Sequence, residues 1–325
     1  MNFFYHYNLN DDRVLYNNNE IIHRPARCTR MFPNCRLTED RKYYDRSNMI
    51  VFHWPDFKFE DIPNHRSSEQ IWLLYNYETP CLTPKLSNNI VVYFNATSLY
   101  QTVADILVPY GETELYFNPF YKPNISEKSL AIIWFATNCD TCSLRENYIH
   151  TLEKYIQVDK FGPCSNNNLC AKEKFHECQQ TLYKKYYFYL AFENSFCEEY
   201  LTEKVFFALK HDIIPIVYGA ANYSKVLPPK SFIDATKYRP KELATLINDL
   251  IVNRTEYLKY FEWKKNYRIQ ADRSTNDHLI CEACRYLQKY KLGKIPRKSI
   301  PFSVINKFYM SSCWSKKRIE ALIKE

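Results

Sequence analysis

Glycine is the residue that this sequence lacks most. Only four glycines occur in 325 residues, and neither G-x-x-x-x-G-K-S/T nor G-x-G-x-x-G is present. These two absences exclude the common glycine-rich loops that hold phosphate groups. Any phosphate site in this chain must therefore be built from side chains and from helix amino termini, where free N–H groups favour anions.

Long apolar runs are missing as well. No run reaches the roughly 18 residues of a membrane-spanning helix. The N-terminus has no positive region followed by an apolar core, so no signal peptide is visible. No Asp-x-Asp motif, which could hold a diphosphate through a divalent cation, occurs either. A hydrophobic content of 46% with 17% aromatic residues nevertheless indicates a globular protein, long enough for two core-bearing domains.

The net charge of +8 suits an acidic partner, such as a nucleotide sugar, a membrane surface or a nucleic acid. Basic residues are spread along the chain apart from the C-terminal segment, which makes a nucleic-acid groove the weakest of these interpretations.

Twelve cysteines and four N-x-S/T sequons indicate an oxidising compartment. The two C-x-x-C pairs keep a zinc site open as an alternative, but they lie far apart in the chain, and disulfides are favoured. The sequence leaves the connectivity open. Plausible local disulfides are Cys28–Cys35, Cys164–Cys170 and Cys281–Cys284.

One stretch organises the rest of the chain. Residues 186–192 are apolar, aromatic and β-prone, which predicts a buried strand. Thr202 is a good N-cap for a following helix, and residues 213–218 predict a second buried strand, closed by Gly219. This order is a strand–helix–strand unit of a parallel sheet. In such sheets ligands bind beyond the carboxyl ends of the strands, where Glu193 and Asn194 fall.

Lys204 lies in the first turn of that helix, where the positive end of the helix dipole disfavours a cation. A bound anion would remove this conflict. Glu203 could accept hydrogen bonds from ribose hydroxyls, and Tyr200 could stack on a base. Without further information, a surface lysine beside an ordinary N-terminal helix glutamate is an equally good interpretation.

Two more residues occupy comparable places. Glu78 follows the predicted strand 71–75, at an edge where parallel sheets display site residues, although a solvated loop carboxylate is the simpler alternative. Arg145 falls in the first turn of a predicted helix after strand 130–135, so it too could hold a phosphate or lie exposed on a charged helix face.

The remaining expectations concern secondary structure alone. Residues 1–40 are expected to be irregular. Further strands are predicted at 49–53, 90–93 and 103–108, and helices at 143–156, 175–185, 256–269 and, from Pro240, over an apolar stripe ending at Ile251.

Four short sequence motifs in and after the central stretch resemble those of a known family. They closely resemble the signature of the α1,3-fucosyltransferases that use GDP-fucose. The matching words are Phe188-Tyr-Leu-Ala-Phe-Glu-Asn-Ser195, Tyr200-Leu-Thr-Glu-Lys204, Ile214-Pro-Ile-Val217 and Ser231-Phe-Ile233.

The resemblance implies an α/β protein of the GT-B type, with two Rossmann-like lobes facing each other across a cleft. The expected divisions are an acceptor-side lobe at 1–123, a GDP-fucose-binding lobe at 124–292 and a basic tail at 293–325, with a linker near 112–125.

It also implies an inverting transfer of L-fucose from GDP-β-L-fucose to a GlcNAc hydroxyl of a glycoconjugate. The general base falls on Glu78, because Glu78-Thr-Pro80 is similar to a Glu-Ser-Pro-like word of the family. The implied donor-binding residues are Arg145 at the diphosphate, Glu203 and Lys204 at the ribose and pyrophosphate, Tyr200 by the guanine, and Glu193 and Asn194 at the fucose.

The resemblance further implies no required cofactor, a divalent cation that is at most stimulatory, no nucleic-acid partner and a place in the Golgi lumen. The family is anchored there by an N-terminal helix that this chain lacks, so we expect a catalytic fragment or an atypical member. Residues 101–105 lack two basic residues of the family pattern, which leaves the acceptor preference open. A glycan-binding protein that kept the fold but lost turnover is the alternative function.

The sequons complete the expectations. Asn95, Asn124 and Asn253 are the glycosylation candidates, whereas a glycan at Asn222 would lie near the expected donor cleft, and low occupancy is expected there.

Overall fold

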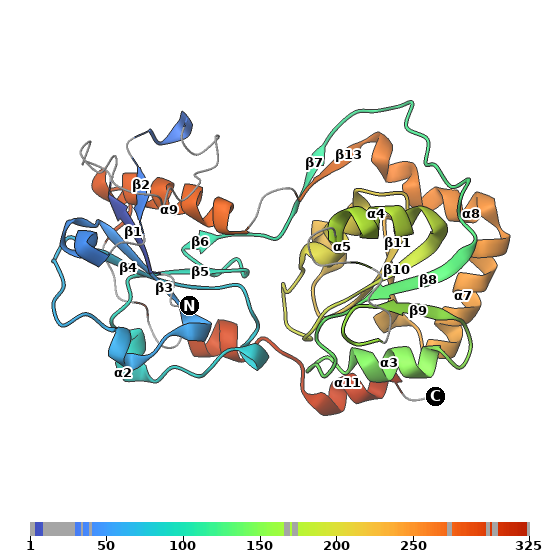
Figure 1. The fold of residues 1–325 in the computed structure, drawn as a ribbon, viewed down its shortest axis with the longest axis horizontal. Coiled ribbons are helices and arrows are strands. Elements are labelled where there is room, and N and C mark those ends of the chain that lie inside the picture. Colours follow the sequence, from blue (N-terminus) through green and yellow to red (C-terminus); the bar gives the residue numbers. More distant parts are fainter. Residues whose placement is uncertain are drawn as a thin grey trace. The chain divides into compact units, whose positions relative to one another are not determined.

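The computed structural model describes residues 4–8, 30–33, 35–38, 41–165, 170, 175–271, 275–296, 300 and 305–323. They divide into two compact units (Figure 1). Unit 1 comprises Met1–Pro109 and Arg273–Ser312, and unit 2 comprises Tyr110–Asp272 and Cys313–Glu325. Each unit has its own largely parallel sheet with helices, so the predicted α/β class is confirmed.

Unit 1 has a six-stranded sheet. Its strands β3 to β6 are parallel to one another, and β1 pairs antiparallel with both β3 and the edge strand β2. Every residue of β4 is buried, as expected for a central strand covered on both faces. In spatial order the strands are β2 (Arg36–Thr38), β1 (Phe4–Asn8), β3 (Met49–His53), β4 (Ile71–Asn76), β5 (Ala96–Leu99) and β6 (Ile106–Leu107).

Three predictions fail in unit 1. The predicted strand 90–93 is instead the one-turn helix α2 (Asn88–Val91), which begins after Ser87. Only Val91 of this run is buried, whereas Val92 and Tyr93 are exposed, so the run has a single inward position. The strand of this region is β5. The predicted strand 103–108 shrinks to β6, and the region expected to be irregular contains β1 and β2.

Helices complete unit 1. The longest, α9 (Thr275–Lys291), buries Leu279, Ala283 and Leu287. The shorter helices are η1 (Arg41–Arg46), η2 (Trp54–Asp56), η3 (Phe59–Asp61), η4 (Pro80–Leu82) and η8 (Ile305–Met310).

Unit 2 has a five-stranded parallel sheet in the spatial order β12-β11-β10-β8-β9. The chain passes from β8 to β9 on one side and then returns to place β10 on the other side of β8. The order therefore reverses between β8 and β10, which is the point where open α/β sheets bind ligands. The strands are β8 (Leu130–Phe135), β9 (Val158–Phe161), β10 (Tyr186–Phe192), β11 (Ile214–Tyr218) and β12 (Ile233–Asp234).

Strand side chains alternate between two cores on opposite faces of this sheet. Along β10, Phe188 and Leu190 enter one core, and Tyr189 enters the other. Helices α3 (Arg145–Leu152), α7 (Pro240–Val252), α8 (Arg254–Leu258) and α11 (Lys316–Ile323) contribute to the first core. Helices α4 (Phe175–Lys185) and α5 (Glu203–Leu209) contribute to the second.

Most predictions for unit 2 are confirmed, including the central strand–helix–strand unit, the helix at 175–185 and Pro240 at a helix start. The predicted helix 256–269 is wrong in its second half. After α8 the chain forms the tight helix η7 (Lys259–Lys265) and then strand β13 (Tyr267–Gln270), which pairs antiparallel with β7 (Glu112–Leu115).

The disulfides differ from every predicted local pair. Those in the described residues include Cys35–Cys284, Cys139–Cys164, Cys170–Cys178 and Cys197–Cys313. Cys28 lies outside the described residues, but its expected partner Cys35 reaches Cys284 in α9. Packing of α9 in unit 1 decides that pairing, and spacing along the sequence does not. Because Cys139 and Cys284 are disulfide-bonded, the zinc alternative is also wrong.

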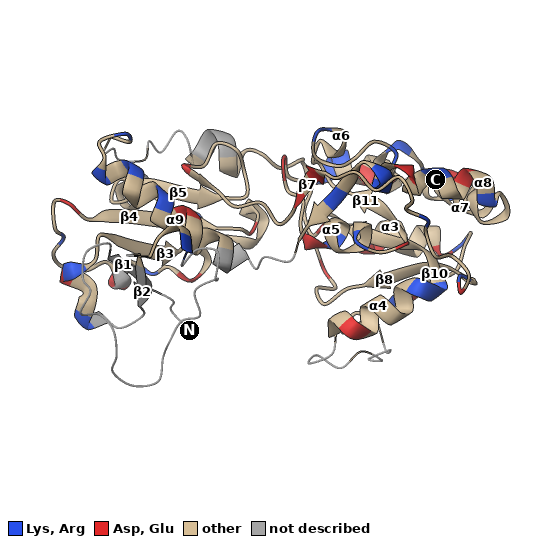
Figure 2. Ribbon diagram, turned by 90° about the horizontal axis from the view of Figure 1, so that it is seen from above, with Lys and Arg blue, Asp and Glu red and all other residues tan. Residues whose placement is uncertain are grey.

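Charged residues lie on both units. In Figure 2 the Lys and Arg residues are interleaved with Asp and Glu on elements of each unit and do not gather along a single stripe.

The Cys35–Cys284 disulfide generates a stability prediction. The two cysteines are 249 residues apart, so the bond closes a very long loop. Replacing both with serine should lower the free energy of unfolding by about 2–5 kcal/mol, because the unfolded chain regains the entropy that the bond removes. Thermal unfolding under non-reducing conditions measures this loss. The matched control replaces Cys170 and Cys178, only eight residues apart, and should cost less. An equal or larger cost for the control would contradict the prediction.

Candidate functional site

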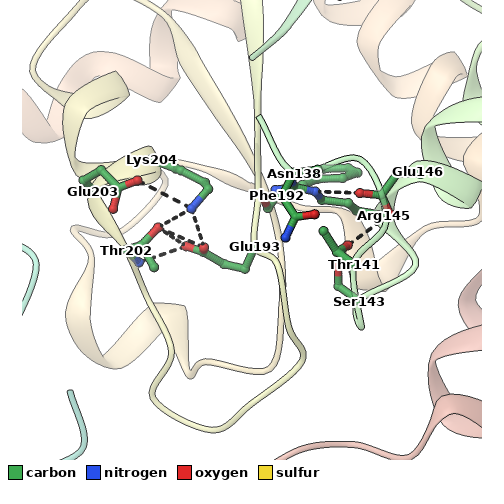
Figure 3. Close-up of polar contacts among 10 residues, drawn as sticks. All are labelled: Asn138, Thr141, Ser143, Arg145, Glu146, Phe192, Glu193, Thr202, Glu203 and Lys204. Atoms are coloured by element: carbon green, nitrogen blue, oxygen red, sulfur yellow. Dashed lines mark hydrogen bonds and ion pairs between the residues drawn. The ribbon is translucent and has the colours of Figure 1, made fainter. Parts of the chain in front are cut away.

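The expected donor-binding residues of unit 2 gather at the switch point of its sheet (Figure 3). Glu193 directly follows β10, Arg145 begins α3 after the loop that leaves β8, and Lys204 lies in the first turn of α5. Parallel strands place their carboxyl ends at one edge, so these side chains lie at the same edge of the sheet although they are up to 59 residues apart in the sequence.

Glu193 and Lys204 form a buried ion pair. The Glu193 side chain is 1% exposed, and its Oε2 lies 3.2 Å from Lys204 Nζ. Thr202 completes the cluster, because its backbone N–H donates to Glu193 Oε1 at 2.8 Å and its hydroxyl lies 2.9–3.0 Å from both carboxylate oxygens. Lys204 Nζ also donates to the Thr202 hydroxyl at 2.8 Å. The anion that the dipole of α5 favours is therefore supplied by Glu193 from the same chain.

Burial and charge oppose each other in this pair. Desolvation raises the pKa of Glu193, although Lys204 and the Thr202 hydrogen bonds favour the ionised carboxylate. Desolvation also disfavours the charge on Lys204, but the Glu193 and Glu203 carboxylates outweigh it and hold the pKa of Lys204 above its ordinary value. Lys204 is therefore a permanent cation at this site.

Arg145 joins the two sides of the switch point. Its side chain is only 2% exposed, and its guanidinium donates to the Phe192 carbonyl at 2.8 Å and to the Asn138 carbonyl at 2.7 Å. The Arg145 Nε donates to Glu146 at 3.1 Å. These bonds use three of the five N–H groups of a guanidinium. The arginine therefore holds the end of β10 against the loop after β8, and two of its N–H groups are not used by these three bonds.

Hydroxyl groups lie beside Arg145. The buried hydroxyls of Thr141 and Ser143 are 2.9 Å apart, and Thr141 also donates to Glu146 at 3.0 Å. The backbone N–H of Ser143 donates to the Asn194 carbonyl at 3.0 Å. Sequence reasoning missed Thr141, Ser143 and Thr202 as polar members of this site. Their spacing around Arg145 and Lys204 was visible, but Ser143 and Thr202 reach partners that follow β10, and only Thr141 has its partners nearby in the sequence.

The remaining donor-binding candidates differ in accessibility. The Glu203 side chain is 60% exposed and free to approach a ligand, and its nearest charge is Lys204 at 3.5 Å. Asn194 is half-buried. Tyr200 is 2% exposed and packs edge-to-face on Tyr110, so base stacking on Tyr200 would require this residue to move.

Gly219 permits a close approach behind Glu193. A Cβ at this position would meet the hydroxyl of Tyr223 at 2.6 Å and Glu193 Cγ at 3.4 Å. Within the part of the chain that the structure describes, the buried hydroxyls of Tyr218 and Tyr223 and the indole N–H of Trp134 make no hydrogen bond. Trp134 is the second-to-last residue of β8, Tyr218 is the last of β11 and Tyr223 begins α6 (Tyr223–Val226), so these donors lie at the ligand-binding edge.

Glu78 lies in unit 1, two residues after β4, and is half-buried. Its backbone is fixed at both ends. The N–H of Glu78 donates to Asn76 Oδ1 at 2.8 Å, and the carbonyl of Glu78 accepts a hydrogen bond from the Tyr309 hydroxyl. The structure thus puts Glu78 at the carboxyl edge of the unit 1 sheet, as its sequence position predicts. Nothing in the sequence indicated Tyr309, which is 231 residues away.

Other features bear on earlier expectations. In the described residues, no three His, Cys, Asp or Glu side chains come together as a metal site. No helix within the same residues is long and apolar enough to cross a membrane. Asn95 is 6% exposed, and its side-chain oxygen accepts the Trp72 N–H at 3.0 Å, which disfavours a glycan there. The sequons at Asn124, Asn222 and Asn253 are exposed.

The fold and the site define a doubly wound α/β protein with cations collected at the ligand-binding edge of one sheet. Comparison with protein families gives its place among such proteins. A family model described as glycosyltransferase family 10 (fucosyltransferase), C-terminal, matches residues 125–300, and one described as fucosyltransferase, N-terminal, matches residues 9–111. The chain belongs to glycosyltransferase family 10, the fucosyltransferases, and the resemblance in its sequence words is confirmed.

Two relatives agree with this assignment. Alpha-(1,3)-fucosyltransferase C of Drosophila melanogaster is 30% identical over 294 residues, which cover 83% of this chain and 67% of that protein. The 3-galactosyl-N-acetylglucosaminide 4-alpha-L-fucosyltransferase FUT3 of Homo sapiens is 34% identical, with coverages of 81% and 74%. A crystal structure of an alpha1,3-fucosyltransferase with GDP-fucose is 16% identical, with a TM-score of 0.47 over 74% of this chain and 78% of that chain.

The Glu193–Lys204 pair generates a prediction about stability and pH. Replacing Lys204 with Ala leaves a buried carboxylate without its cation, so the free energy of unfolding at pH 7 should fall by about 3–5 kcal/mol. Glu193, whose pKa burial already raises, would then bind a proton more readily folded than unfolded. The loss should therefore shrink as the pH falls toward the unfolded pKa of about 4.3.

Urea unfolding at pH 7 and pH 5 measures both effects. The double variant Glu193→Gln/Lys204→Ala has no buried charge and should lose less stability than Lys204→Ala, with no pH dependence from this site. Lys237→Ala, which removes an exposed cation 3.8 Å from Asp234, is the matched control and should cost less than about 1 kcal/mol. Equal losses for the single and double variants would contradict the prediction.

Proposed function

We propose that this protein transfers L-fucose from GDP-β-L-fucose to a GlcNAc hydroxyl of a glycoconjugate, most simply in α-1,3 linkage and with inversion at the anomeric carbon. The observation that carries the proposal is that Lys204 and Arg145 both lie at the carboxyl edge of one parallel sheet, in two neighbouring clusters of polar contacts, in a glycosyltransferase family 10 chain. Two cations there suit the diphosphate of a nucleotide sugar. The exposed Glu203 carboxylate next to them suits ribose hydroxyls.

We further propose a GT-B arrangement, in which the lobe that contains Glu78 presents the acceptor to the lobe that binds GDP-fucose. The proposed lobes are residues 1–123 and 124–292, and the tail is 293–325. Support comes from the chemistry of each part. The cations that suit a diphosphate all come from the second lobe, whereas Glu78 follows a parallel strand of the first by two residues. Tyr200 remains our candidate for the guanine side of the donor site.

The reaction is a single displacement. The acceptor hydroxyl oxygen attacks the anomeric carbon of fucose, the bond from that carbon to the β-phosphate oxygen breaks, and GDP leaves with the electron pair. Glu78 takes the proton of the attacking hydroxyl as the new bond forms. Lys204 and Arg145 stabilise the charge that develops on the leaving diphosphate, which is greater in the transition state than in the bound donor.

The present contacts of Lys204 and Arg145 determine how a phosphate of the donor could reach each cation. Lys204 retains 18% exposure beside its three oxygen partners, so a phosphate can approach its ammonium group without removing Glu193. Arg145 is more enclosed and offers only its two remaining N–H groups. Glu193 itself is a poor substitute for Glu78 as the base, because its buried carboxylate is already bonded to Thr202 and Lys204. We propose that Asn194, with the unpaired donors of Tyr218 and Tyr223, lines the fucose pocket.

The setting follows from the same proposal. The acceptor is a GlcNAc-containing glycan on a glycoprotein or glycolipid, and the compartment is the Golgi lumen, where the disulfides of this chain would form and persist. No cofactor is required by the mechanism. A divalent cation would at most stimulate it, because side chains already supply positive charge at the diphosphate.

The first test concerns Glu78. Glu78→Gln keeps the size of the side chain but cannot accept the proton, so kcat should fall by about 10²–10⁴-fold. GDP affinity should stay at the wild-type level, because no proposed nucleotide contact is lost. Transfer from GDP-fucose to a GlcNAc-terminated acceptor and calorimetric GDP binding measure the two quantities. Near-normal transfer would remove Glu78 from the role of base. Wild-type protein that binds GDP and glycan without any transfer would favour the glycan-binding alternative.

The second test concerns Lys204 as a pyrophosphate ligand. Lys204→Ala alone would leave a buried carboxylate without its cation. The comparison is therefore between Glu193→Gln and the double variant Glu193→Gln/Lys204→Ala. Loss of a charge-assisted contact should cost about 1.5–3 kcal/mol of GDP binding, or roughly 10- to 150-fold in Kd. Lys237→Ala added to Glu193→Gln is the control and should leave Kd unchanged. Equal GDP affinity with and without Lys204 in folded protein would contradict the role.

A further inference from the structure

The C-terminal segment of unit 1 inserts one side chain beneath the Glu78 loop. Tyr309, in η8, is fully buried. Its ring packs against Trp54 with centroids 4.9 Å apart and against Tyr100 at 6.2 Å. The Ser312 hydroxyl donates to the Tyr309 carbonyl at 2.7 Å, which fixes the backbone of the segment as well. The phenol oxygen therefore has one well-defined position.

The hydrogen bonds around this phenol can be assigned without conflict. The amide nitrogen of Asn76 donates one hydrogen to Thr83 Oγ1 at 2.8 Å and the other to the Tyr309 oxygen at 2.6 Å. Thr83 donates its own hydrogen to the Thr79 carbonyl at 2.8 Å, so the Thr83 oxygen, which also lies 3.0 Å from the Tyr309 oxygen, donates nothing to the phenol. The Tyr309 hydroxyl donates its hydrogen bond to the Glu78 carbonyl. Asn76 Oδ1 accepts the N–H of Glu78, so each donor has one acceptor.

This network holds the main chain on both sides of Glu78. The N–H and the carbonyl of Glu78 are both bonded, the next carbonyl is bonded to Thr83, and Pro80 then starts η4. Burial raises the pKa of Tyr309 well above its ordinary value, so the phenol stays a donor throughout the working pH range. Removing that donor would leave a buried carbonyl unpaired at the residue on which the chemistry depends.

We propose that Tyr309 is a positioning residue for the reaction: through its bond to the Glu78 carbonyl, the C-terminal segment sets where the catalytic base stands. This inference rests on the proposed function of Glu78. It gives residues 305–312 a role in catalysis without any contact with substrate. It also explains why a phenol is placed there, since phenylalanine would fill the same space against Trp54 and Tyr100 but could not hold the loop.

Tyr309→Phe tests the proposal. A displacement of about 1 Å at a catalytic group can cost on the order of 10²-fold in rate, so we expect kcat to fall by about 10- to 100-fold. The Kd for GDP should be unchanged. Tyr257→Phe is the matched control, because Tyr257 is also a fully buried phenol and donates to the Tyr187 carbonyl at 2.9 Å in unit 2. That variant should lose similar thermal stability without the loss in kcat.

A double-mutant cycle with Glu78→Gln separates positioning from a general loss of structure. If Tyr309 acts through the base, Tyr309→Phe should lower kcat little or not at all in the Glu78→Gln background. Equal fold losses in both backgrounds, or a wild-type kcat for Tyr309→Phe, would overturn the proposal. A fully active Glu78→Gln enzyme would instead overturn the proposed base, so the two failures are distinguishable. If Tyr309→Phe does not fold, Thr83→Val, which removes the hydroxyl that holds the Thr79 carbonyl, replaces it in the cycle with the same expected non-additivity.

Discussion

The buried carboxylate of Glu193 is the constraint on which the donor side of this protein depends. It stands where β10 ends, beneath the start of α5, and it would be costly there without a cation. Lys204 supplies that cation from the helix turn that would otherwise repel it, and Thr202 supplies two hydrogen bonds. One arrangement thus pairs the buried carboxylate, gives the start of α5 an anion and makes a cation in its first turn favourable. Under the proposed function, a phosphate would meet an ammonium group that is already fixed, so little ordering would remain to be done on binding.

A second constraint works from the opposite side of the switch point. Arg145 bonds to carbonyls of the β8 loop and of β10, so its guanidinium holds together two segments that the chain separates by 54 residues, from Asn138 to Phe192. In a protein with four glycines, these side chains and carbonyls stand at the edge of the sheet where many nucleotide-binding folds have a glycine-rich loop. Gly219 is one glycine that this edge does need, because the Tyr223 hydroxyl occupies the space that any Cβ would need.

The C-terminal segment contributes to each unit separately. Tyr309 enters unit 1 under the Glu78 loop, and four residues later Cys313 bonds to Cys197 of unit 2. Trp314 follows with a backbone hydrogen bond to the Phe196 carbonyl at 2.7 Å, and Ile319 of α11 enters the unit 2 core. The sequence shows a basic tail whose packing on the lobes it leaves open, and the structure buries side chains of this tail in each unit.

The sequence by itself determined the α/β class, the strands at 49–53, 71–75 and 186–192, the helix at 175–185, the family and the placement of Glu78, Arg145 and Lys204 at strand and helix ends. Those features are local, because periodicity, caps and motif words are written in consecutive residues. Tertiary structure decided what depends on distant partners. Cys35 bonds to Cys284 and not to Cys28, residues 90–91 join a helix because only one position of their run can face the core, and a tyrosine 231 residues away holds the Glu78 carbonyl. No local pattern encodes such contacts, since which side chains meet is set by how strands and helices pack.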